Sequence, residues 1–161
     1  MKVDSAPSWW ARPKGCEYAV RFPSSIPKET IAFQPAFGEY IQTEAVVVGE
    51  NGAYLRMECL PITTVQRTTM SNKQHMLNAL VQYATKNGIE FADYTYEVTA
   101  RGFKTVGNVA ATFGVQTYLG QKSLLTLYGA TISSGYPSGP IVSFFSSVTR
   151  VDLQKTQWHA F

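Results

Sequence analysis

The amino-acid sequence predicts a single α+β domain in which helices flank a mostly antiparallel β-sheet. Strand-like runs come first, and helical patterns are inserted between and after later runs, unlike the regular strand–helix alternation of a parallel sheet. The chain has 161 residues, of which 45% are hydrophobic and only 16% are charged. A chain of this size and composition buries one core, and it is neither disordered nor a coiled coil.

The chain opens with two short predicted strands. Tyr18, Val20 and Phe22 alternate with other residues up to Pro23, which lacks the amide hydrogen that a central strand needs. Residues 29–34 form the second strand.

A hairpin is predicted from residues 39–48 and 53–60. A two-residue Asn51-Gly52 turn would place Glu44 opposite Cys59 on an apolar face, and burying an unpaired charge costs several kcal/mol. A three-residue turn that also includes Glu50 avoids this cost, so we expect this register. It places Thr43, Ala45 and Val47 beside Cys59, Met57 and Leu55, and sends outward Glu44, Tyr54, Arg56 and Glu58.

Two helices follow the hairpin in the prediction. The first spans residues 71–87, because Ser71 and Gln74 have the spacing of a capping box and Asn87-Gly88 ends the apolar pattern. The second opens at Ser138-Gly139-Pro140, with proline at an early helical position. Its buried stripe is formed by Ile141, Phe144, Phe145 and Val148.

Three strands are predicted between the helices, over residues 94–100, 103–119 and 123–132. The middle one is long, and we expect a bend or bulge at Gly107 or Gly114. The turn-rich segments 61–70 and 133–139 are expected to be loops that form the rim of any site.

The domain is expected to cover residues 15–150, with an N-terminal extension over 1–14 and a C-terminal tail over 151–161. No window approaches the roughly 20 apolar residues of a transmembrane helix, and residues 1–7 do not resemble an export signal. The low charge and the many Ser and Thr residues are typical of a mature exported protein, so a periplasmic or otherwise exported location is expected, with the cytoplasm as the alternative. A net charge of +3 is too mild to indicate a nucleic-acid partner.

Cys16 and Cys59 are the only two cysteines, and their wide spacing excludes a zinc site or a redox pair of the usual kind. In an exported protein they could form one disulfide. The interpretation that the pattern favours is a buried core thiol at Cys59, which follows Leu55 and Met57 at period two.

No motif of a hydrolase nucleophile, a phosphate-binding loop or a zinc protease occurs, so no cofactor or metal is expected. The most enzyme-like feature is the pair Glu44 and Glu58, which the expected register places opposite each other with Cβ atoms about 5 Å apart. This separation is close to the carboxyl spacing of retaining glycosidases. The competing interpretation is a solvated charge cluster that includes Arg56.

Aromatic residues make up 13% of the chain, more than an average core needs. Exposed tyrosine and tryptophan side chains offer a large contact area at low entropic cost, which favours a binding patch. The candidates for this patch are Trp9, Trp10, Tyr94, Tyr96 and Tyr118. The competing interpretation is that the tryptophans close one end of the core and that a helix covers the tyrosines.

Several pieces of the chain match a known family. They are the opening 18–23, the central helix, the glycine-bearing strand 107–114, the apolar strand 123–132 and the closing 141–148. These pieces resemble the Mog1/PsbP-like superfamily, and within it small bacterial envelope proteins of unassigned function. The resemblance covers about residues 15–150 and implies an α-β-α sandwich, in a family whose members mostly bind other proteins and share no catalytic motif.

Three functions follow as expectations. The first is a non-catalytic protein-binding or assembly domain of the bacterial cell envelope that uses the aromatic patch. The second is a small hydrolase in which Glu44 and Glu58 act on carbohydrate. The third is a structural subunit that forms homo-oligomers through the edge of the long strand 103–119.

Overall fold

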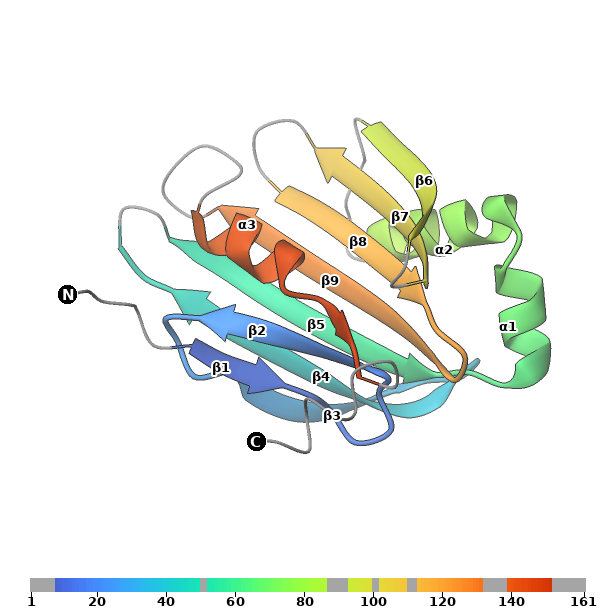
Figure 1. The fold of residues 1–161 in the computed structure, drawn as a ribbon, viewed down its shortest axis with the longest axis horizontal. Helices are drawn as coiled ribbons and strands as arrows, with labels where there is room; N and C mark the ends of the chain where they lie inside the picture. The colour runs from blue at the N-terminus through green and yellow to red at the C-terminus, as the bar shows by residue number, and fades with distance from the viewer. Residues whose placement is uncertain are drawn as a thin grey trace.

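The computed structural model describes residues 8–49, 52–86, 93–99, 102–109, 113–131 and 139–151 (Figure 1). For Ala84, Phe113 and the segments 93–99 and 102–109 it describes the backbone alone. The described part is mostly strand with three helices, which confirms the α+β class.

Seven strands build the large sheet. Their bounds are β3 (Lys28–Gln34), β4 (Gly38–Val47), β5 (Ala53–Pro61), β6 (Asp93–Thr99), β7 (Gly102–Val109), β8 (Phe113–Leu119) and β9 (Ser123–Thr131). They lie in the order β3-β4-β5-β9-β8-β7-β6, and each neighbouring pair is antiparallel, as the sequence predicts.

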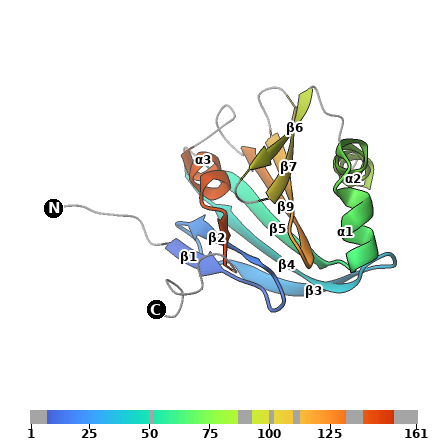
Figure 2. The same cartoon turned by 45° about the vertical axis from the view of Figure 1, so that its right-hand side comes forward.

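A smaller antiparallel sheet and one helix cover one face of the large sheet. The small sheet has the order β1-β2-β10, formed by β1 (Ser8–Ala11), β2 (Tyr18–Pro23) and β10 (Thr149–Arg150). Helix α3 (Gly139–Ser146) lies beside it and contacts β2, β5 and β9. Figure 2 shows α1 (Thr64–Met70) and α2 (Lys73–Lys86) on the opposite face. None of these helices is long and apolar enough to cross a membrane.

The main core fills the space between the two sheets and α3. Its largest fully buried side chains include Tyr18, Phe22, Phe144 and Tyr118. On the opposite face, Met76 and Leu80 of α2 are fully buried over the large sheet. Both faces of the sheet are therefore covered, as its near-continuous apolar strands require.

The carboxylate of Glu17 ties the small sheet to the large one. It accepts hydrogen bonds from the backbone amides of Gln121 at 2.9 Å, Lys122 at 2.7 Å and Ser123 at 2.8 Å, and from the Ser123 hydroxyl at 2.8 Å. These donors belong to the turn between β8 and β9 and to Ser123, the first residue of β9. The side chain is only 10% exposed, so its loss would leave several donors without a partner.

Replacing Gly120 by alanine should break this arrangement, because a Cβ at residue 120 overlaps the Glu17 carboxylate. We expect G120A to lower the free energy of unfolding by about 2–3 kcal/mol, the scale of lost charge-assisted hydrogen bonds, measured by urea denaturation. G139A is the matched control, since nothing lies within 4 Å of a Cβ at that glycine. Equal stability of G120A and G139A would contradict this account.

The hairpin of β4 and β5 confirms the predicted faces but not the predicted register. Val47 pairs with Ala53, so five residues join the strands, and every pair is shifted by two positions from the expected one. Gly49 has a φ of 113°, a conformation that L side chains rarely adopt, and the amide of Gly52 donates to its carbonyl at 3.0 Å. Gly49 therefore takes part in the turn ahead of Asn51-Gly52, and the loop between β4 and β5 is longer than expected.

The capping box lies earlier than predicted. The Thr63 hydroxyl accepts from the amide of Gln66 at 3.1 Å, and the Gln66 side chain accepts from the amide of Thr63 at 2.8 Å. This box starts α1 within the segment 61–70, which the prediction left as a loop. Ser71 ends α1 rather than starting the next helix, and the Asn72 side chain accepts from the first turn of α2.

One further prediction about strands was wrong. Residues 103–119 are not one bulged strand, because β7 and β8 pair antiparallel and the chain reverses between them. No glycine or proline at 110–112 signals this reversal. Residues 8–11, expected in an N-terminal extension, form β1, which pairs with β2 along its full length.

Candidate functional site

The carboxylates Glu44 and Glu58 do not face each other. Glu44 is paired with Arg56, and Glu58 is paired with Gln42, because the register differs from the expected one by two residues. The expected cross-strand pair was wrong. A glycosidase-like arrangement needs two carboxyl groups facing across a bond, so the register removes the observation on which that function rested.

Glu58 is also not part of a solvated charge cluster. It is only 4% exposed, because α2 packs over its face of the sheet. Its carboxylate lies 3.3 Å from the Nε of Arg56, and the hydroxyl of Tyr40 donates to it. Burial raises the pKa of the Glu58 carboxyl, and the charges of Arg56 and Lys86 offset this rise only in part.

Arg56 is held by tyrosine side chains as well as by Glu58. Its guanidinium carbon lies 5.9 Å, 5.5 Å and 5.2 Å from the ring centroids of Tyr54, Tyr83 and Tyr128. The Nε and Nη2 atoms donate to the Tyr83 hydroxyl, the former at 3.1 Å. We call Arg56, Glu58 and these three tyrosines the Arg56 cluster.

Sequence reasoning missed the Arg56 cluster as a unit. Positions 54, 56 and 58 are two residues apart, so the sequence alone places them on one face of β5. It does not show that Tyr83 from α2 and Tyr128 from β9 join them. The Tyr54 hydroxyl donates to Glu44 at 2.6 Å. Burial and this bond raise the pKa of Tyr54 to about 12, so the phenol remains protonated at neutral pH.

The five aromatic candidates do not form one patch. Trp9 and Trp10 lie on β1, and Trp10 is 47% exposed. Tyr94 and Tyr96 lie on β6, at the far edge of the large sheet, and Figures 1 and 2 both show β6 well away from β1. Tyr118 was expected at the surface but is 1% exposed, because the small sheet covers its face and its ring packs against Tyr18.

Among the strand residues whose side chains the structure describes, the most exposed large apolar ones lie on β3. This strand is an edge of the large sheet within the described part of the chain. Ile31 is 75% exposed and Phe33 is 67% exposed, and they share one face because they are two residues apart. Edge strands offer unpaired backbone groups, and an exposed apolar edge favours pairing with another chain.

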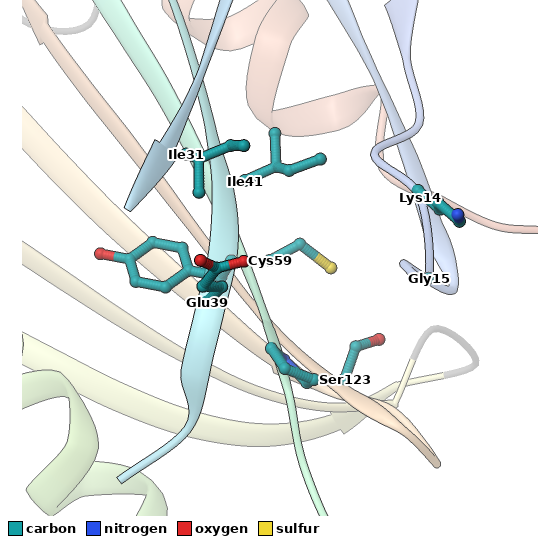
Figure 3. A pocket seen from close by; sticks show the side chains of 9 residues that line it. Lys14, Gly15, Ile31, Glu39, Ile41, Cys59 and Ser123 are labelled. Atoms are coloured by element: carbon teal, nitrogen blue, oxygen red, sulfur yellow. The ribbon is translucent and has the colours of Figure 1, made fainter. Parts of the chain in front are cut away.

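A cavity of about 250 Å³ adjoins this strand. Figure 3 shows Ile31 and Ile41 on one side of it and Lys14 and Gly15 across from them. Cys59 lies between these walls. We call Ile31, Phe33 and this cavity the β3 surface. Sequence reasoning placed a strand here but had no signal that it would be an edge.

Cys16 and Cys59 are joined in a disulfide, one of the two states that the sequence left open. The bond connects the loop before β2 to β5, and so holds the small sheet against the large one beside the cavity. Within the described residues, no group of three or more His, Cys, Asp or Glu side chains is arranged to hold a metal ion.

Comparisons with models of known protein families, with curated proteins and with solved structures give no significant match to this chain.

Proposed function

We propose that this protein is a protein-binding domain that takes up an extended segment of a partner protein beside β3. The observation that carries the proposal is an edge strand with two strongly exposed apolar side chains, Ile31 and Phe33, next to a cavity. Partner strands are recognised in this way when main-chain hydrogen bonds extend the sheet and alternate side chains meet the surface.

The sequence of β3 supports this use. Residues 30–34 contain no charge and no proline, which are the usual devices that protect an edge from pairing. Pro27 and Pro35 lie just outside the strand, so the segment open to pairing is short. Ile31 pairs with Ile41 on its inner side, and both line the cavity, so a partner residue on the outer side of Ile31 would lengthen the apolar row that borders the cavity.

We further propose that the protein works in the bacterial envelope and is a member of the Mog1/PsbP-like superfamily. The disulfide supports an oxidising compartment, since such bonds persist mainly in exported proteins. An antiparallel sheet covered on both faces supports the superfamily assignment at the level of architecture. The class of function is the one expected from the sequence, but the surface is β3 in place of the aromatic patch.

The test is a selection of random linear peptides on the immobilised protein, followed by affinity measurement with the enriched peptides. We expect peptides with alternating apolar residues, and we expect I31K and F33K each to weaken their binding about tenfold or more, because each change removes apolar contact and adds a charge at the edge. V65K and V142K are matched controls, since these valines are 76% and 52% exposed on α1 and α3.

Equal weakening by all four lysine variants, or peptide-induced amide shifts away from β3, would overturn the proposal. Concentration-dependent self-association that I31K abolishes, with no peptide enrichment, would show that the occupant of β3 is a second copy of this chain and would also overturn it. The long strand from which self-association was expected is replaced by β7 and β8, which are both paired on two sides.

A further inference from the structure

A buried polar row crosses the large sheet beneath α2, away from the β3 surface. Gln42, Glu58, Thr126 and Thr117 lie directly opposite one another on β4, β5, β9 and β8. Glu58, Thr126 and Thr117 are 4%, 5% and 1% exposed. On one side of this row the next residues on the same face are Leu60, Leu124 and Leu119. On the other side are Arg56 and Tyr128, so the polar row lies between an apolar region and the Arg56 cluster. Burying polar groups is costly, which makes such a row a candidate site.

A cavity of about 190 Å³ opens over this row. Glu58 and Thr126 line it from the sheet, and Lys86 lines it from the last turn of α2. Leu60, Leu124 and Met70 provide apolar walls. Sites for drug-sized ligands are usually about 300–1,000 Å³, so this cavity suits a smaller molecule of amino-acid size.

The two charged residues in the cavity wall have opposite signs. Glu58 forms an ion pair with Arg56 and accepts from Tyr40, and a carboxylate offers about four acceptor positions, so it retains capacity for a further donor. Lys86 is exposed and lies close enough to act on the charge of Glu58. A ligand with only a negative charge would meet Glu58, and one with only a positive charge would meet Lys86.

We propose that this cavity binds a small zwitterion with an apolar body, of the class of a free apolar α-amino acid. The ammonium group would donate to Glu58 and the Thr126 hydroxyl. The carboxylate would pair with Lys86, and the apolar side chain would lie between Leu60, Leu124 and Met70. Each feature of the cavity wall thus meets one part of the ligand.

The probes are L-leucine and two analogues that each lack one charged group, 4-methylpentanoate and 3-methylbutylamine. We expect calorimetric titration of the full chain to show leucine binding in the millimolar range or tighter. Each analogue should bind at least about tenfold more weakly, because each loses one charge-assisted contact, and tenfold corresponds to about 1.4 kcal/mol.

Variants assign each contact to a residue. E58Q should reduce the advantage of leucine over 4-methylpentanoate, and K86Q should reduce its advantage over 3-methylbutylamine. K73Q, at the exposed first turn of α2, is the matched control and should bind as the wild type does.

The analogue comparison on the wild type stands even if a variant fails to fold. The proposal is overturned if leucine does not bind, if either analogue binds as well as leucine, or if folded E58Q and K86Q keep the wild-type preferences. Lysine variants of β3 should leave leucine binding unchanged, so this result is separate from the outcome of the peptide selection.

Discussion

Replacing both Cys16 and Cys59 by alanine is expected to lower the free energy of unfolding by about 4 kcal/mol. The disulfide closes a loop of 43 residues in sequence separation, and the chain-entropy argument assigns a loop of this length a stabilisation of about 4 kcal/mol. The bond also holds the loop before β2 against β5, so its loss removes a covalent cross-link between two segments that are distant in the chain. Urea denaturation of the variant and the wild type measures the difference.

Reducing agent provides the internal control for this prediction. It should lower the denaturation midpoint of the wild type toward that of the double variant and should leave the double variant unchanged. Mass analysis after thiol alkylation under native conditions should find no reactive cysteine in the wild type. Two alkylated cysteines in the untreated, folded protein, or a wild type whose stability does not respond to reduction, would contradict the prediction.

Replacing Arg56 by methionine is expected to cost about 3–5 kcal/mol at pH 7, the scale for removing one partner of a buried ion pair. Glu58 is 4% exposed, and its charged form would be buried without its closest cation. The variant R56M with E58Q should recover much of the loss, because it leaves no buried charge behind. R67M is the matched control, since the Arg67 side chain makes one hydrogen bond, to the carbonyl of Gly120 at 3.0 Å.

In the wild type, the raised pKa of Glu58 also makes the stability of the protein depend on pH. Its pKa is raised in the folded state, so the folded protein binds the proton more tightly than the unfolded chain does. The contribution of Glu58 to stability is therefore greatest below its unfolded pKa, near 4.3, and is lost as the pH rises through its folded pKa.

Arg56 is one of the cations that offset the rise in pKa, so R56M should raise this pKa further and lose stability over a wider pH range. E58Q should remove this part of the pH dependence, both in the otherwise wild-type protein and in R56M. Thermal or urea unfolding between pH 4 and pH 8 measures it. An R56M variant that becomes more stable as pH rises from 5 to 8 would contradict the assignment.

Local patterns of the chain predicted most strands and two of the helices correctly. Tyr18, Val20 and Phe22 alternate into a buried strand, and Ser138-Gly139-Pro140 marked the start of α3. Period-two alternation also assigned Glu58 and Met57 to opposite faces of β5. Such features depend on neighbours within a few residues, so a single sequence contains the information for them.

The errors in strand pairing arose where neighbours within a few residues do not determine the structure. A shift of two residues preserves the faces of a strand, so the alternation could not reveal that Glu44 pairs with Arg56. The reversal between β7 and β8 lacks a glycine or proline signal. Ser71 and Gln74 have the spacing of a capping box, which is why the predicted helix began at Ser71, but they do not form one.

The sequence by itself determined the α+β class, the faces of the β4–β5 hairpin and the absence of usual catalytic motifs. Only the tertiary structure decided which face each helix covers, and with it the burial of Glu58 and Tyr118. It also decided that β3 is an edge and that Glu58 and Lys86 share a cavity. These properties depend on contacts between segments far apart in the chain, where packing of whole elements outweighs local preference.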